Sequence, residues 1–349
     1  MFMEAYSMYD IRKRFVFIFM IMLIAATTIP GRAQSYKKTG QAGMTFLKID
    51  GNARAAAMGG SYVAQNADVI SIFYNPAGLG SMEGAAVSVS QTNWIADIKH
   101  NSIAAAYSFG KWGVVGLSLV DMDYGTLHGT TVSFSSSQSF GFEYEETGTF
   151  EVDDYAIGMA YATSVTDRFN VGVHVRYVKE DMGENFIQIG DVQKVSQNEV
   201  DNIAVDVGTI YNTGFKDLTL GMSVRNFSSE TTYPNLNEGF YMPLVYSVGV
   251  AVDLFEFFIP ESESQKLMLC IEGQHPNDNV ERLNLGAEYQ YTDWFFLRGG
   301  YKVNYDIEDF SGGLGVNLEV AGMNLQFDYA VSRIKYFDNV NRLSLTIHL

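Results

Sequence analysis

Residues 46–80 read FLKIDGNARAAAMGGSYVAQNADVISIFYNPAGLG, the only long segment after the N-terminal leader in which apolar and polar residues do not alternate. The alanine-rich run Ala53–Ala57 favours a short helix, and the pair Gly59–Gly60 would end it. Nearly everything after Gly84 shows the alternation of amphipathic strands. We therefore predict that this compact, partly helical segment is a plug around which the strands close.

The rest of the chain divides into fourteen segments of about the length that a tilted strand needs to cross a bilayer. They are 84–93, 100–109, 112–122, 153–163, 168–180, 200–211, 217–227, 240–252, 266–275, 280–291, 295–304, 309–319, 322–332 and 341–349. In the last segment Leu343, Leu345 and Ile347 share one face, and Arg342 and Ser344 share the other. This period also fits a soluble sandwich, but an even strand number is typical of single-chain bacterial barrels. We predict an all-β fold, an antiparallel outer-membrane β-barrel of about 14 strands.

The predicted connections alternate in length, which also favours the barrel. The turns after the second, fourth, sixth, tenth and twelfth strands are short, whereas 126–152, 181–199 and 228–239 are long. Outer-membrane barrels have short periplasmic turns and longer extracellular loops, and a soluble sandwich has no reason to keep this parity. Residues 255–265 are an exception, a longer turn expected on the periplasmic side. We expect the three long loops to be solvated and to offer the surface where partners bind.

The N-terminus has the features of a secretory signal peptide. Arg12, Lys13 and Arg14 precede an apolar run over 15–26, and small residues precede a cleavage site before Gln34. The apolar run is too short to serve as a membrane anchor. We therefore divide the chain into a signal peptide at 1–33, a plug segment at 34–83 and a transmembrane barrel at 84–349.

Charge and cysteine content exclude some functions. The formal net charge of −17 repels nucleic acid, so we expect no nucleic-acid partner. Cys270 is the only cysteine, which rules out an intramolecular disulfide.

Three blocks of the opening segment carry a family resemblance: Phe46–Ile49, Ala53–Gly60 and Asn75–Leu79. In this order, after a leader and before a β-rich chain, they resemble the N-terminal region of PorV/PorQ outer-membrane proteins, within the FadL-like barrels. The resemblance implies a part in the type IX secretion system. Its implied partners are the secretion translocon or attachment proteins, and the C-terminal domains of secreted cargo.

The resemblance also implies that the plug is a hatch fixed by its Asn-Pro-Ala element. The candidate plug residues are Arg54, Gly59, Gly60, Asn75, Pro76, Ala77 and Gly78. The amide of Asn75 can satisfy backbone groups, and small residues permit close approach to the wall. Arg54 needs a carboxylate partner, for which Asp206 and Glu288 are candidates. The alternative to a hatch element is a tight turn that leads into the first strand.

The predicted register also sends a set of ionisable side chains into the lumen. They are His174, Arg176, Asp206, Arg225, Glu272, Glu288, Arg298, Lys302, Glu319 and Asp328. They would be costly against lipid. They either line a polar channel or form a mixed-sign network that ties the wall to the plug, and the sequence favours the network.

Enzyme signatures are missing from the sequence. The histidines lack metal-ligand spacing, and there is no P-loop, dinucleotide fingerprint or GxSxG elbow. His174 and His348 are the only inward-facing candidates for catalysis, with no matching serine. We predict a protein that is not an enzyme, with no catalytic residues, no metal and no cofactor.

We therefore predict a barrel in the outer membrane of a Gram-negative bacterium, in contact with outer-membrane lipid, that serves type IX secretion. One alternative is a FadL-like channel for long-chain fatty acids or other hydrophobic solutes, which would hold a hydrophobic ligand. Another is a structural barrel with no transport role.

Overall fold

The computed structural model describes residues 40–134, 142–189, 192–233, 239–258 and 264–349. The predicted signal peptide lies outside these residues. Within them, no helix is both long and apolar enough to cross a membrane.

In the described chain, fourteen antiparallel strands form a closed barrel, in which β1 pairs with β18. These strands are β1 (Ala85–Asn93), β2 (Lys99–Ser108), β3 (Val114–Asp123), β6 (Asp153–Thr166), β7 (Phe169–Ile189), β8 (Val192–Asn212), β9 (Thr219–Phe227), β12 (Val245–Asp253), β13 (Gln265–Pro276), β14 (Arg282–Tyr291), β15 (Phe295–Val303), β16 (Glu308–Val320), β17 (Met323–Ile334) and β18 (Val340–His348). Closure pairs the backbone of every strand on both sides, which a bilayer requires. The predicted fold is confirmed.

Side chains alternate across the barrel wall as the pattern predicts. In β18, Leu343 is 61% exposed on the outer face, whereas Arg342 and Ser344 are 1% and 5% exposed on the inner face. Leu345 pairs with Val89 of β1 and Phe327 of β17, both on the outer face. The wall therefore turns apolar side chains outward and polar side chains toward the lumen.

The two ends of the barrel differ. At one end, which we call the short-turn end, tight connections join β6 to β7, β14 to β15 and β16 to β17, and β18 finishes beside the start of β1. Two small helices lie in connections at this end, η5 (Gly110–Trp112) and α3 (Phe255–Phe258). The opposite end, the long-loop end, carries the long connections and the small helix η4 (Ile95–Asp97).

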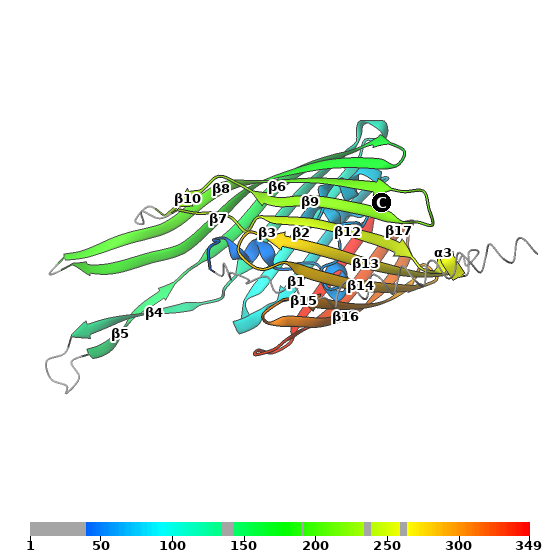
Figure 1. Cartoon of the computed structure of the whole chain (residues 1–349). Helices are drawn as coiled ribbons and strands as arrows, with labels where there is room; N and C mark the ends of the chain where they lie inside the picture. Colours follow the sequence, from blue (N-terminus) through cyan, green and yellow to red (C-terminus); the bar gives the residue numbers. More distant parts are fainter. Residues whose placement is uncertain (1–39, 135–141, 190–191, 234–238, 259–263) are drawn as a thin grey trace, which may run out of the picture. The chain divides into compact units, whose positions relative to one another are not determined.

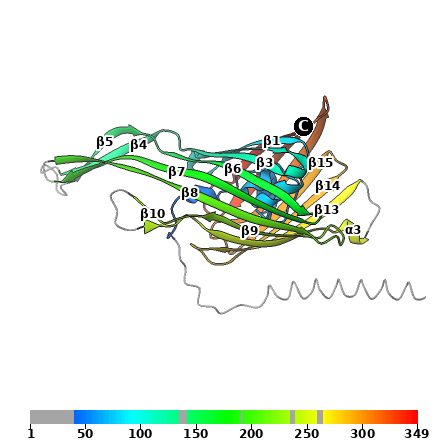
Figure 2. The ribbon, with the colours of Figure 1, turned by 90° about the horizontal axis from the view of Figure 1, so that it is seen from above.

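At the long-loop end the structure corrects one expectation, because the long connections are largely strands. β4 (Leu127–Phe134) pairs with β5 (Phe142–Phe150), β10 (Thr231–Thr232) pairs with β11 (Gly239–Phe240), and β7 and β8 continue together well beyond the wall. Figure 1 shows the β4–β5 ribbon and the outer parts of β7 and β8 projecting past the barrel, and Figure 2 shows them again from above. The β-branched residues in these connections favour extended pairing, which a loop assignment from polarity missed.

The plug occupies the lumen. It contains η1 (Thr45–Lys48), α2 (Ala53–Ala57), η2 (Val69–Phe73) and η3 (Pro76–Ser81). Its large side chains, among them Tyr62, Val63, Ile72 and Leu79, pack with small wall residues. Those wall residues are Ala86, Ala104, Ala106, Ala160 and Ala162. Small inward side chains thus leave room for the plug inside a barrel of this size.

The plug crosses the lumen from end to end. At the long-loop end, the amide of Gly43 donates to Tyr241 O at 3.2 Å and that of Met44 donates to Glu180 Oε2 at 3.0 Å. At the short-turn end, Ser164 Oγ donates to Gly80 O at 3.1 Å. The first strand then begins at Ala85.

Candidate functional site

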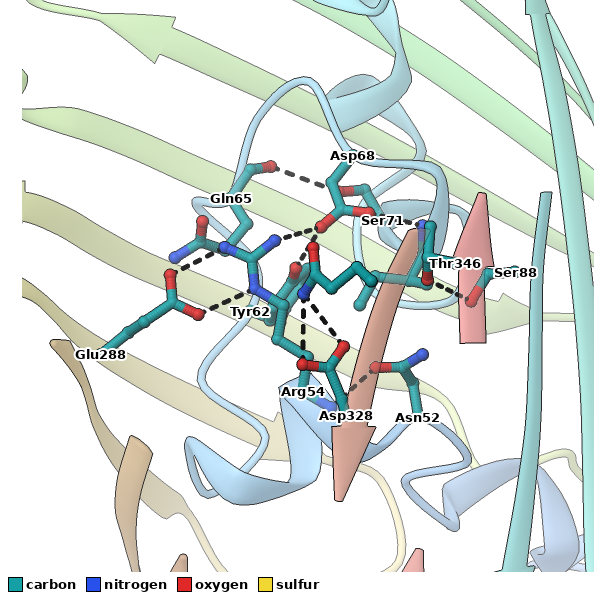
Figure 3. Close-up of polar contacts among 12 residues, drawn as sticks. Asn52, Arg54, Tyr62, Gln65, Asp68, Ser71, Ser88, Glu288, Asp328 and Thr346 are labelled. Carbon is teal, nitrogen blue, oxygen red and sulfur yellow. Dashed lines mark hydrogen bonds and ion pairs between the residues drawn. The ribbon is translucent and has the colours of Figure 1, made fainter. Parts of the chain in front are cut away.

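The contact between plug and wall is organised around Arg54 of α2, whose side chain lies beside Glu288 (Figure 3). Asn52 caps this helix, because its side-chain oxygen accepts from the amide of Arg54 at 2.9 Å. The amide of Ala53 donates to Ser344 Oγ of the wall at 2.8 Å. The start of the helix is therefore held by both its own cap and β18.

The guanidinium of Arg54 binds two carboxylates. Its Nε and Nη2 donate to both oxygens of Glu288, at 2.9 and 2.8 Å, and its Nη1 donates to Asp68 at 2.7 Å. Glu288 comes from β14 of the wall, whereas Asp68 belongs to the plug. Of the two partners predicted for Arg54, Glu288 is correct and Asp206 is wrong. A bidentate pair of this kind fixes orientation as well as charge.

The network continues into the wall on one side and into the plug on the other. Arg298 donates to Glu288 at 2.5 Å and to Asp328 at 2.6 Å. The Tyr62 hydroxyl donates to Asp68 at 2.5 Å. The mixed-sign arrangement satisfies buried charges that would otherwise be costly.

A glycine on an intervening strand allows the pair Arg298–Asp328 to form. The two residues lie on β15 and β17, with Gly315 of β16 between them. A Cβ at Gly315 would lie 2.4 Å from Asp328 Oδ1 and 2.6 Å from Arg298 Nη1. Because Gly315 has no side chain, residues on the two strands that flank β16 can form an ion pair across it.

Asn75 anchors the last part of the plug. It is fully buried, and its amide nitrogen donates to Val63 O at 2.6 Å and to Thr209 O of β8 at 3.1 Å. Its oxygen accepts from the amide of Ala77 at 3.1 Å. One side chain thus joins two plug segments to the wall and caps η3, which Pro76 begins.

Close approach at this anchor depends mainly on glycines of the wall. A Cβ at Gly208 would lie 1.8 Å from Asn75 Oδ1, and one at Gly172 would lie 2.4 Å from Pro76 C. Gly78, expected to approach the wall, instead packs against Ser71 and Gln65 of the plug. Sequence reasoning missed the wall glycines because only the register shows which of them faces Asn75.

The other predicted plug glycines have left-handed backbone conformations. Gly59 has φ +66°, and a Cβ there would lie 3.0 Å from Leu285 O of the wall. Gly60 has φ +73° beside Asp50. Both positions favour glycine, which turns the chain sharply at the end of α2.

A backbone contact fixes the middle of the plug. Glu272 of β13 accepts from the amides of Tyr62 and Val63, both at 2.9 Å. Cys270, two residues earlier, is buried and accepts from Gln65 Nε2 at 3.1 Å. These contacts attach to the wall a stretch of the plug that lies between the helices α2 and η2.

A second charged group lies on the wall at β7 and β8. His174 Nδ1 lies 3.1 Å from Asp206 Oδ2, and Arg176 donates to Asp206 Oδ1 at 2.7 Å. His174 Nε2 shares a hydrogen bond of 2.8 Å with Ser118 of β3. The prediction that no serine matches His174 is therefore wrong. Ser118 reaches across β6 because Gly158, which lies between them, has no side chain.

The order Ser118, His174, Asp206 has the connectivity of a hydrolytic triad. However, Ser118 is only 5% exposed, and His174 and Asp206 are 0% and 1% exposed. Asp206 also accepts from the amide of Asn226 at 2.7 Å. A substrate carbonyl has no access to the serine here, and the group neutralises buried charge in the wall.

The remaining predicted lumen residues lie apart from these groups. Arg225 donates to Phe73 O of the plug at 3.0 Å, and Lys302 pairs with Asp50 at 2.8 Å and with Glu308. Glu319 is exposed near the end of β16. Across the described chain, no group of three or more His, Cys, Asp or Glu residues is placed to hold a metal ion.

A cavity of about 510 Å³, which we call the outer chamber, lies between the plug and the strand ends at the long-loop end. Its lining includes Phe46 and Asp50 of the plug, and Trp94, Arg225, Arg282 and Tyr305 of the barrel. Residues 45–50 of the plug form part of its lining. The outer chamber is thus a pocket bounded in part by the plug.

A sequence profile described as "Type IX secretion system membrane protein PorP/SprF" matches residues 69–347. The chain belongs to this family. As a PorP/SprF protein it is a type IX secretion system membrane protein, which agrees with the predicted system. The finer assignment to PorV/PorQ is not confirmed, because the matching profile is that of PorP/SprF.

This PorP/SprF chain has the fold of solved FadL-like outer-membrane barrels. A Pseudomonas aeruginosa FadL homologue has a TM-score of 0.54 at 10% identity, covering 86% of this chain and 98% of its own. The CymD monoaromatic hydrocarbon channel has a TM-score of 0.53 at 12% identity, covering 85% and 96%. The Pseudomonas putida toluene transporter TodX has a TM-score of 0.51 at 12% identity, covering 86% and 97%. No curated protein matches the chain.

Proposed function

We propose that this protein is a sealed, non-enzymatic docking barrel of the type IX secretion system, in the outer membrane of a Gram-negative bacterium. The observation that carries the proposal is the plug. Wall residues hold it at Arg54, at the amides of Tyr62 and Val63, and at Asn75. A lumen filled and fixed in this way suits a scaffold better than an open pore.

The ribbons at the long-loop end supply the docking surface. By the parity of barrel connections this end faces outward. Residues 124–154 contain six carboxylates and no lysine or arginine, and Glu146, Glu151 and Asp153 among them are exposed. A partner with a basic face therefore fits this surface best, and association should weaken as salt screens the charges.

For the more specific role, we propose that the protein acts as PorV/PorQ-like proteins do. In that role the barrel accompanies the translocon or receives the C-terminal domain of secreted cargo and passes it to the attachment machinery. Its partners are then secretion-system proteins and cargo.

Replacement of 127–150 by a short Gly-Ser linker tests the docking role. Among the described residues, β4 pairs with β5 and with no strand of the barrel, so the barrel should form normally. We expect affinity purification from solubilised outer membrane to lose the secretion-system proteins that wild type retains. A linker inserted at Thr292–Asp293, at the short-turn end, is the control. Full retention of partners by the ribbon deletion would refute docking at this surface.

A second candidate is a channel for hydrophobic solutes. The observation that favours it is the outer chamber, whose lining includes Phe46, Leu47, Ile98, Met122 and Ile307. Under this candidate, extraction of the purified protein should release a bound apolar molecule such as a long-chain fatty acid. Uptake of such a solute by cells should also depend on the protein, whereas the docking role predicts no dependence.

A further inference from the structure

The outer chamber contains four cationic side chains, two of which are neutralised by neighbours. Lys48 pairs with Asp278 at 2.5 Å, and Lys302 pairs with Asp50 and Glu308. Arg225 and Arg282 also line the outer chamber. Among the residues that the structure describes, neither arginine forms an ion pair with a carboxylate.

Within the described part of the chain, Arg282 is held by an aromatic ring and its side chain donates no hydrogen bond. Its guanidinium lies over the Tyr305 ring, with the central carbon 4.3 Å from the ring centroid. The Tyr305 hydroxyl donates to Gln274 at 3.2 Å, which fixes the ring beneath it. Stacking on an aromatic face orients a guanidinium and leaves its planar set of N–H donors available.

Polar atoms around Arg282 and Arg225 lack partners. The Nε atoms of both arginines are buried with no hydrogen-bond acceptor within the described structure. Asn284, 1% exposed and two residues from Arg282 on the same inner face, has a buried side-chain oxygen without a donor. Buried polar groups are normally satisfied, so a ligand that offers both acceptor and donor atoms would complete this cluster.

The shape and lining of the outer chamber define the ligand further. A guanidinium group binds a planar anion with two oxygens, such as a carboxylate, bidentately, and both arginines line the outer chamber. The apolar and aromatic lining, including Ile98, Trp94 and Met122, suits a hydrocarbon or side-chain body attached to that anion. Asp306, an exposed loop residue on the lining, places the outer chamber next to solvent at the long-loop end.

We propose that the outer chamber binds a carboxylate joined to an apolar group, with Arg282 and Arg225 as the anion-binding residues. This chemistry occurs in a small amphipathic acid and in the free C-terminus of a peptide. The proposal does not depend on the docking role, because the outer chamber is complete without the β4–β5 ribbon.

Trp94 allows a direct binding test, because it lines the outer chamber. The other tryptophans, Trp112 and Trp294, are 74% and 51% exposed at the short-turn end. The full-length barrel carrying Trp112→Phe and Trp294→Phe, in a nonionic detergent, therefore reports on this cavity through Trp94 fluorescence. Decanoate and decanol form one probe pair. A hexapeptide with an apolar C-terminal residue, as free acid and as amide, forms the second.

We expect saturable binding of at least one acid, and binding at least about tenfold weaker for its uncharged counterpart. Arg282→Gln should weaken acid binding at least about tenfold, and Arg282→Lys should recover part of the loss by restoring charge without the planar fork. The matched control is Arg333→Gln, which removes an arginine that is 61% exposed on the side chain and pairs with Asp309. Heat-modifiable mobility on gels confirms that each variant is folded.

The outcomes distinguish the two kinds of molecule that could supply the carboxylate. Binding of decanoate alone assigns a small amphipathic acid, and binding of the peptide acid alone assigns a C-terminus. Failure of both acids to bind at millimolar concentration overturns the proposal. Equal binding of acid and uncharged probe, or an Arg282→Gln affinity within twofold of the control variant, overturns it as well.

Discussion

Substitution of a single wall glycine should release the plug without touching the plug sequence. Gly208 faces Asn75, and a Cβ there would overlap Asn75 Oδ1 at 1.8 Å. The short side chain of Asn75 cannot retreat without losing its contacts, because the same oxygen accepts from Ala77 and the nitrogen holds Val63 O and Thr209 O. Gly208→Ala therefore removes the anchor, although alanine is tolerated in the strand itself.

The magnitude follows from the three hydrogen bonds that Asn75 makes. At about 1 kcal/mol net for each bond, their loss destabilises the seated plug by about 3 kcal/mol. Since about 1.4 kcal/mol is a factor of ten, the ratio of unseated to seated plug should rise about a hundredfold. The wall should remain intact, because its ladder of inter-strand hydrogen bonds closes on itself.

Conductance in planar bilayers measures this ratio as the frequency of open events, and heat-modifiable gel mobility reports on the barrel. The control is Gly299→Ala, at a position where a Cβ meets nothing within 4 Å. We expect frequent openings for Gly208→Ala and none above wild type for Gly299→Ala. If both variants open as rarely as wild type, Asn75 does not anchor the plug. If Gly208→Ala abolishes the barrel itself, this contact is needed for folding of the wall.

Three further predictions follow from the network, the wall and the topology. Glu288→Gln removes the carboxylate that Arg54 and Arg298 share. We expect the frequency of open events to rise at least as much as in Gly208→Ala, because breaking a buried ion pair costs about 3–5 kcal/mol. Unchanged conductance would show that this network does not hold the plug. Leu345→Arg, on the lipid face, should destabilise the assembled barrel by about 2–4 kcal/mol if it lies at the midplane, and so lower its amount in membrane fractions. Asn341→Arg, on the same face nearer the long-loop end, should be tolerated, and the reverse ranking would contradict the membrane depth assigned to the two residues. In a Cys270→Ser background, single cysteines at Gly40 and Asn198 should react with an impermeant reagent on intact cells, whereas one at Thr292 should not; the opposite pattern would invert the barrel.

The strands could be predicted from the sequence because each one carries its own signal. The segment predicted at 266–275 is the strand Gln265–Pro276, and that at 322–332 is Met323–Ile334. Alternation also determines which side chains face inward. It therefore placed Arg298 and Asp328 in the lumen before any pairing was known.

The contacts between inward side chains could not be predicted in the same way. Ser118 and His174 meet across β6, and this depends on the register of three strands and on a glycine at position 158. Arg282 is an inward residue of β14 like many others, and only the folded chamber shows that it lacks a carboxylate partner. The ribbons of β4, β5, β7 and β8 were missed because their polar residues resemble those of solvated loops.

The path of the plug through the lumen constrains the order in which the protein assembles. The chain enters at the long-loop end, where Met44 contacts Glu180, and leaves at the short-turn end, where β1 begins. β1 then pairs with β18, its partner from the far end of the sequence. If the wall closed first, more than a full plug length of chain would have to thread through a sealed cylinder. We therefore expect the plug to fold against the sheet before the barrel closes, with the pairing of β18 and β1 as the last step. The N-terminal segment would then act as a template for the assembly of the barrel.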